Sequence, residues 1–64
     1  MTSISGMVVF ATCGIGADVT LRLDSGEVKT LPIHRNDFDR AGKLFGKRAR
    51  WTHETGQMPK IRGG

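Results

Sequence analysis

The chain has 64 residues, a formal net charge of +4, and a hydrophobic share of 38%. A domain this short buries only about 60% of the surface that its unfolded form exposes, which argues against a deep catalytic cavity. The single cysteine, Cys13, excludes an intrachain disulfide and a zinc site built on cysteine pairs, so we expect one domain over residues 1–64 in a reducing compartment, the cytoplasm.

The first predicted strand covers Ile4–Thr12. Two alternating sets of its side chains are both apolar: Ile4, Val8 and Phe10, and Met7, Val9 and Ala11. This pattern predicts a strand that is covered on both faces. The apolar stretch Met7–Ala11 is too short for a signal peptide or a membrane span, so no membrane association is expected.

A hairpin is predicted next. Val19, Leu21 and Leu23 alternate with polar residues, which is typical of a strand with one buried face. Asp24–Gly26 has the composition of a tight turn, and the return strand is expected over Glu27–Ile33. The alternation breaks in this return strand, which predicts a bulge or bend near Thr30, and Pro32 places the end of the strand at a sheet edge.

A short helix is predicted after the hairpin. Asn36 is the expected N-cap, apolar residues recur at helical spacing from Phe38, and Gly46 occupies the position of a left-handed C-cap. The helix would then have about two and a half turns. The four aromatic residues have apolar partners in phase and are expected in the core: Phe10, Phe38, Phe45 and Trp51.

Two further strands complete the chain. Lys47–His53 alternates again, and Thr55 and Gly56 mark a turn before a last strand around Met58–Arg62. Three strands, a short helix and two strands is the order of the five-stranded OB-like barrel, and an SH3-like barrel is the neighbouring possibility. The sequence therefore predicts a mainly β fold, a small five-stranded barrel with one helix between strands 3 and 4.

Three parts of the chain carry a family resemblance: Val19–Ile33 (VTLRLDSGEVKTLPI), the helix ending in Gly46, and Gly46–Trp51 (GKRARW). Their spacing resembles that of small bacterial OB-fold RNA-binding proteins of the translation initiation factor one type. The resemblance implies a cytoplasmic barrel that contacts RNA with basic residues on its strands. In this sequence those residues are Arg22, Lys29, Arg48, Arg50, Lys60 and Arg62.

The charge distribution agrees with such a role. Residues 34–64 contain eight Lys and Arg residues against three Asp and Glu residues, whereas residues 1–33 contain two against three. Arg48 and Arg50 share one side of a predicted strand, about 7 Å apart, close to the spacing of successive phosphates. We therefore expect a nucleic-acid-binding module, with single-stranded or structured RNA favoured over DNA.

The sequence leaves two alternative functions open. The same basic face could dock on an acidic protein surface, as in a small regulator or inhibitor, with Met58 or an exposed Phe45 as the apolar anchor. The C-terminal Gly63–Gly64 is similar to the tail of ubiquitin-like and sulfur-carrier proteins, a minor alternative. We expect no enzyme activity, no metal and no cofactor, because Cys13 is expected to be a buried, inert thiol and the two histidines lie far from each other in the sequence.

Overall fold

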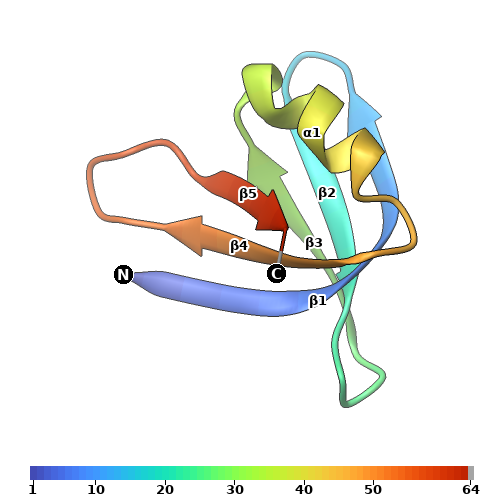
Figure 1. Ribbon diagram of the computed structural model, residues 1–64. Coiled ribbons are helices and arrows are strands. Elements are labelled where there is room, and N and C mark those ends of the chain that lie inside the picture. The colour runs from blue at the N-terminus through green and yellow to red at the C-terminus, as the bar shows by residue number, and fades with distance from the viewer. Residues whose placement is uncertain (64) are drawn as a thin grey trace.

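The computed structural model describes residues 1–63 and consists of five strands and one short helical segment (Figure 1). The strands are β1 (Thr2–Cys13), β2 (Ala17–Arg22), β3 (Val28–Ile33), β4 (Arg48–His53) and β5 (Lys60–Gly63). A 3-10 turn (Arg35–Asp37) and α1 (Phe38–Lys43) lie between β3 and β4. The prediction of a mainly β fold with one short helix between the third and fourth strands is confirmed.

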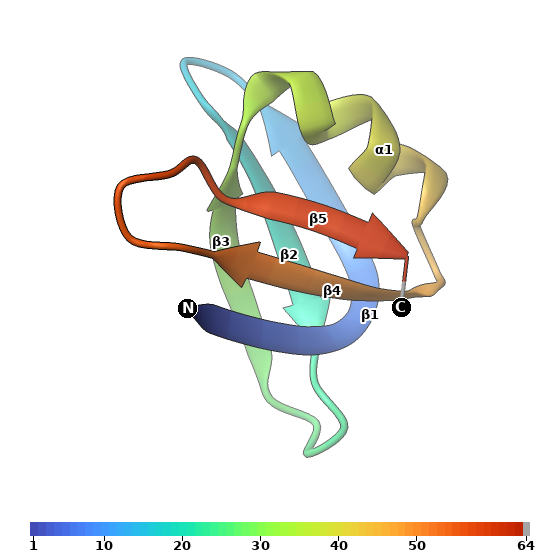
Figure 2. The same cartoon turned by 60° about the vertical axis from the view of Figure 1, so that its left-hand side comes forward.

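All five strands form one antiparallel sheet in the order β3-β2-β1-β4-β5. The long β1 is shared: its first half pairs with β4, from Thr2 opposite His53 onward, and its second half pairs with β2, ending with Cys13 opposite Ala17. Because β1 curves, the β4–β5 hairpin lies across β2 and β3 (Figures 1 and 2).

A side-chain hydrogen bond links β4 to the edge strand β3 across the curled sheet. The Trp51 indole Nε1 on β4 donates a hydrogen bond of 2.7 Å to the carbonyl oxygen of Pro32 on β3. Within residues 1–63 the backbone ladders end at β3 and at β5, with no ladder joining these two strands. The sheet is therefore strongly curled, and a closed barrel stays a prediction.

A β-bulge in β1 corrects the sequence prediction for this strand. The register with β2 shifts between Val8 and Phe10, so Val9 is an extra residue, whereas β2 and β3 pair without a shift at Thr30. An extra residue reverses the alternation of the side chains that follow it. Val8 is buried, but Phe10 is turned outward and 57% exposed. Met7 is 41% exposed, so β1 is not covered on both faces as predicted.

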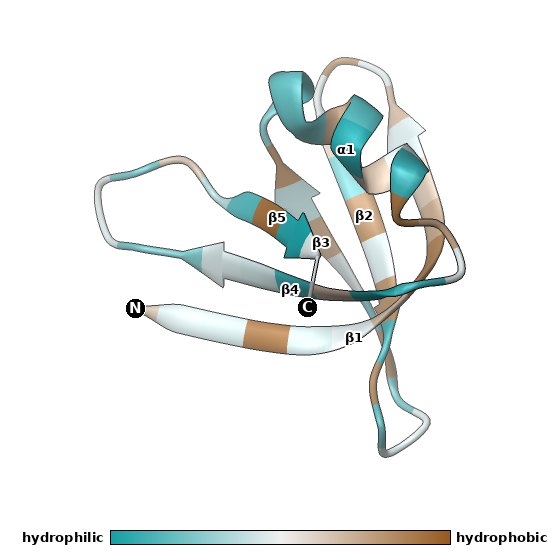
Figure 3. Ribbon diagram, in the orientation of Figure 1, coloured by the Kyte–Doolittle hydropathy of each residue, from teal (hydrophilic) through white to brown (hydrophobic). Residues whose placement is uncertain are grey.

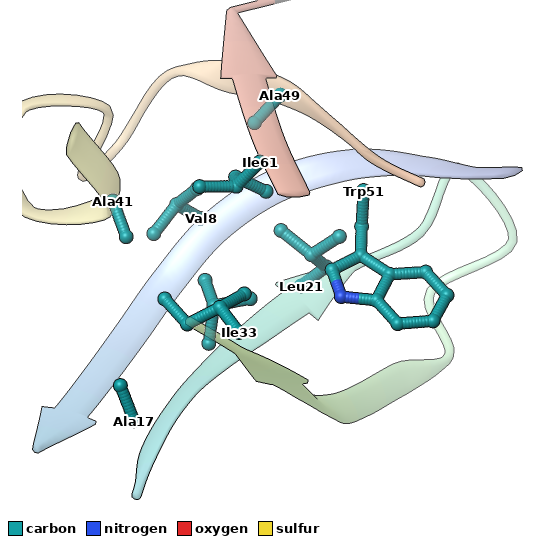
Figure 4. Packing of buried hydrophobic residues seen from close by; sticks show 9 residues of the cluster. Val8, Ala17, Leu21, Ile33, Ala41, Ala49, Trp51 and Ile61 are labelled. Atoms are coloured by element: carbon teal, nitrogen blue, oxygen red, sulfur yellow. The ribbon is translucent and has the colours of Figure 1, made fainter. Parts of the chain in front are cut away.

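The core lies between the two halves of the curled sheet and under α1 (Figure 4). It contains nine buried hydrophobic residues: Val8, Ala17, Val19, Leu21, Ile33, Ala41, Ala49, Trp51 and Ile61. α1 contributes Ala41 alone, since the six-residue helix presents a single fully buried position. Of the aromatic residues expected in the core, only Trp51 is buried, and Phe38 is half-buried and packs against the core cluster.

Three small residues lie side by side where β1, β4 and β5 pair. Gly6 on β1 and Gly63 on β5 lie opposite Ala49 on β4, one on each side. A Cβ atom placed on Gly6 would lie 2.6 Å from the backbone oxygen of Arg22, closer than side chains tolerate. The end of β2 therefore crosses β1 at a distance that only glycine permits, which fixes where Arg22 stands.

The helix is shorter than predicted, and Asn36 is not its N-cap. The imidazole Nδ1 of His34 caps the 3-10 turn by accepting a hydrogen bond of 3.0 Å from the backbone nitrogen of Asn36, whereas the N-cap of α1 is Asp37, whose side chain makes no capping hydrogen bond. Gly46 has a φ of 77°, as expected for a left-handed residue after a helix. Phe45 is 61% exposed, because α1 ends at Lys43 and the following backbone pairs with β1 at Val8.

Candidate nucleic-acid interface

One face of the sheet points away from the core, and we call it the outer face. Residues directly opposite each other in an antiparallel ladder project to the same side, so the register assigns its members. They are Ser3, Ser5, Met7, Phe10 and Thr12 on β1; Asp18, Thr20 and Arg22 on β2; Val28, Thr30 and Pro32 on β3; Arg48, Arg50 and Thr52 on β4; and Lys60 and Arg62 on β5.

Five of the six basic residues selected from the sequence share this outer face: Arg22, Arg48, Arg50, Lys60 and Arg62. All five are exposed. In Figure 3, β5 is hydrophobic in its middle and hydrophilic on both sides, in agreement with buried Ile61 between exposed Lys60 and Arg62. Arg48 and Arg50 point to the same side of β4, as predicted, because the alternate residues Ala49 and Trp51 are buried on the other side.

Lys29 does not join this group. It lies opposite Leu21, whose side chain is buried, and so it projects toward the inner side of the sheet. It is nevertheless exposed, because the β2–β3 hairpin extends beyond the core at this end (Figure 1). Lys29 is therefore separated from the five outer cations by the sheet itself.

Two of the outer cations face each other directly. Arg50 on β4 is the register partner of Arg62 on β5, and its partner on the other side is the uncharged Ser5. Like charges opposite each other in a ladder destabilise a sheet by roughly 0.2–1 kcal/mol. An anion between the two guanidinium groups would remove this repulsion and accept hydrogen bonds from both.

Arg48 is engaged within the protein. Its guanidinium Nη1 and Nη2 donate to Oδ1 and Oδ2 of Asp24 at 3.0 and 3.2 Å, a two-pronged ion pair between β4 and the β2–β3 turn. The hydrogen bonds first, and the positive charge second, hold the pKa of the Asp24 carboxyl below its ordinary value. Four outer cations therefore remain without a carboxylate partner in residues 1–63: Arg22, Arg50, Lys60 and Arg62.

Exposed apolar side chains lie among these cations, which the sequence reasoning missed. Met7 is the register partner of both Arg22 and Arg48, and Phe10 lies further along β1 opposite Thr20. Aromatic rings on a basic strand face are the usual means of stacking nucleic-acid bases. The expectation that Phe10 lies in the core is wrong, because the bulge at Val9 turns its side chain outward.

A shallow hollow of about 220 Å³ opens on the outer face beside the ion pair. Its lining residues are Met7, Arg22, Leu23, Asp24, Gly46 and Arg48. Met7 and Leu23 supply apolar surface, while the two arginines and the aspartate supply charge. The hollow combines contributions from β1, β2, β4 and two connecting segments, so it exists only in the folded chain.

The remaining candidates from the sequence do not meet at one place. Cys13 is exposed at the end of β1, not buried as expected, because the chain turns there into the β1–β2 connection. Within residues 1–63 no three His, Cys, Asp or Glu side chains are grouped as metal ligands. Gly63 belongs to β5, opposite Ala49, and Gly64 of the diglycine lies outside the described residues.

Comparison with protein-family models, curated proteins and solved structures found no significant match to this chain. In the described part of the chain, the helical segments are all too short to cross a bilayer.

Proposed function

We propose that this protein binds single-stranded RNA through the outer face of its sheet. The observation that carries the proposal is that four cations without a carboxylate partner in residues 1–63 share one face of the sheet with the exposed side chains of Met7 and Phe10, and that one of them, Arg22, is the register partner of Met7. Guanidinium groups hold phosphates in two-pronged hydrogen bonds, and apolar or aromatic surface between them takes the faces of unpaired bases.

A single strand suits this surface better than a duplex. The exposed apolar side chains of the outer face, Met7 and Phe10, would meet only sugar and phosphate on a duplex, where the base faces are stacked on each other. An unpaired strand can place phosphates at the cations and bases on Met7 and Phe10. We place this activity in the cytoplasm, where a lone exposed thiol such as Cys13 stays reduced.

The experiment is a fluorescence titration of a labelled oligouridine with three proteins over a range of salt concentrations. They are the wild type, Arg50→Ala/Arg62→Ala, and the control Arg40→Ala/Lys43→Ala on α1. Both double variants lower the formal net charge from +4 to +2. Each phosphate contact on a single strand contributes about −0.7 to the slope of log K against log salt, so four contacts give about −2.8 and the sheet variant about −1.4.

The control separates a site from general charge. We expect the α1 variant to keep the wild-type slope, because Arg40 and Lys43 are exposed on the helix and not on the outer face. Equal slopes for the two double variants would mean that net charge alone attracts the RNA. No binding of the wild type at low salt would overturn the proposal.

A second candidate function is docking on an acidic protein surface, and one observation favours it. Met58 is 58% exposed and lies beside Thr52 and Lys60 at the β4–β5 end of the outer face, where it lines a smaller hollow of about 130 Å³. An exposed apolar residue beside cations can anchor a protein interface. Met58→Ser would weaken such a complex strongly, whereas RNA binding centred on Met7 and Phe10 would be unchanged.

A further inference from the structure

The hollow beside the ion pair has the dimensions and the chemistry of a site for one flat ring system. Its volume of about 220 Å³ is below the roughly 300 Å³ at which pockets for extended ligands begin. Met7 and Leu23 offer apolar contact to the face of a ring. Arg22 lines the same hollow, and a guanidinium plane can stack on an aromatic ring.

Asp24 gives this hollow a specific hydrogen-bonding requirement. Both of its carboxylate oxygens accept, one from each terminal nitrogen of Arg48, so the carboxylate is arranged to receive two parallel N–H donors. An ionised carboxylate accepts and cannot donate. A ligand that takes the place of the Arg48 guanidinium must therefore present two adjacent donors with the same spacing.

Guanine is the nucleobase that meets this requirement. Its N1–H and its N2 amino group form part of a guanidine unit, and they present two parallel donors on the Watson–Crick edge. Adenine and cytosine each place one donor beside an acceptor, and uracil places one donor between two acceptors. An acceptor facing the Asp24 carboxylate would be repelled, so these three bases are disfavoured at the same position.

We propose that the hollow holds a single guanine base of a bound RNA strand, with the Asp24 carboxylate accepting from N1–H and N2–H. This inference rests on the proposed function and adds base preference to it. Guanine exchanges with the Arg48 guanidinium at the carboxylate, which releases Arg48 for the phosphates of the same strand. In the absence of RNA, the ion pair keeps the Asp24 carboxylate oriented toward the position of the two donors. The side chains of Asp24 and Arg48 are 78% and 54% exposed, so both groups can exchange partners.

The test compares oligouridines that carry one central guanosine, inosine or adenosine. Inosine keeps N1–H but lacks the N2 amino group, so it removes one of the two donors alone. Three proteins are titrated: the wild type, Asp24→Asn and Asp18→Asn. Asp18 is the matched control because it is an acid on the same outer face that does not line the hollow, and both substitutions raise the net charge equally.

We expect the wild type and Asp18→Asn to bind the guanosine oligomer at least about fivefold more tightly than the inosine oligomer, the lower end of the discrimination given by a two-pronged base contact. Asp24→Asn should lose this preference while binding all the oligomers as tightly as the wild type or more tightly, since Arg48 is then free. Asparagine is as suitable as aspartate in a tight turn, so the fold is retained.

Three results would overturn the inference. Equal affinity of the wild type for guanosine and inosine oligomers would remove the base preference while leaving RNA binding intact. A preference that persists in Asp24→Asn would place the base elsewhere. Binding of free GMP as tightly as the guanosine oligomer would make a nucleotide, and not a strand, the ligand. Failure of all oligomers to bind would instead reject the proposed function, and the inference with it.

Discussion

Gly6 offers the sharpest test of the fold that positions the outer face. In Gly6→Ala the new Cβ would lie 2.6 Å from the Arg22 carbonyl oxygen and 3.0 Å from its carbonyl carbon. The first of these distances is 0.8 Å shorter than 3.4 Å, where ordinary contacts begin. Both neighbours are backbone atoms within the β1–β2 ladder, so β2 has to move away from β1.

The size of the effect follows from two opposing terms. Overpacking of this kind costs about 1–3 kcal/mol, and we expect the upper half because backbone must shift. Replacing glycine by alanine returns about 0.4–1 kcal/mol by restricting the unfolded chain. The net loss of about 1–2.6 kcal/mol corresponds to a fall in Tm of roughly 4–21 °C for a domain of this size.

The assay is urea and thermal unfolding followed by far-UV circular dichroism and by fluorescence of Trp51, the only tryptophan. Gly63→Ala is the matched control: Gly63 is also opposite Ala49, but a Cβ there meets only the Leu44 side chain, at 3.6 Å. We expect the control to retain wild-type stability within about 0.5 kcal/mol. A Gly6→Ala protein as stable as the wild type would refute the close crossing of β1 and β2.

Three further predictions concern side chains. Trp51→Phe leaves the Pro32 carbonyl oxygen without the indole donor, so the free energy of unfolding should fall by about 1–3 kcal/mol in urea titrations followed by circular dichroism. An unchanged urea midpoint would contradict a stabilising role for this hydrogen bond. Arg62→Ala removes the repulsion with Arg50, so Tm should rise slightly while RNA affinity falls, and a fall in both would count against the like-charge pair. Arg48→Ala should raise the Asp24 carboxyl pKa toward its ordinary value in an NMR pH titration, and an unmoved pKa would argue against the ion pair. Because the pKa of Asp24 is lowered in the folded wild type, the ion pair stabilises the fold above the ordinary pKa. This stabilisation is lost as the pH falls through the lower pKa of the folded state.

Much of the fold could be predicted because local patterns determine it. The strict alternation in Arg48–His53 and the Asp24–Gly26 turn each depend on neighbouring residues, and both were predicted where the structure has them. The break in alternation predicted in Glu27–Ile33 is absent from the β2–β3 ladder, which pairs without a register shift. Val28 is 56% exposed on the opposite face, so Lys29, Leu31 and Ile33 share one face in regular phase.

The features of the site that escaped prediction depend on tertiary structure. Phe10 is exposed because Val9 is bulged, and no local signal distinguishes Val9 from its apolar neighbours. The ion pair joins Asp24 and Arg48, which are 24 residues apart in the chain. Turn residues and strand cations are ordinarily solvated, so only the curl of the sheet reveals that these two meet and that a hollow forms beside them.

The most direct measurement of the central claim is an NMR titration of ¹⁵N-labelled protein with a short oligouridine. Binding by the outer face predicts shift changes at the amides of β1, β4 and β5 around Met7, Arg50 and Arg62, and at Phe10, with little change along α1. Changes centred on α1, or none at a low salt concentration, would contradict the account.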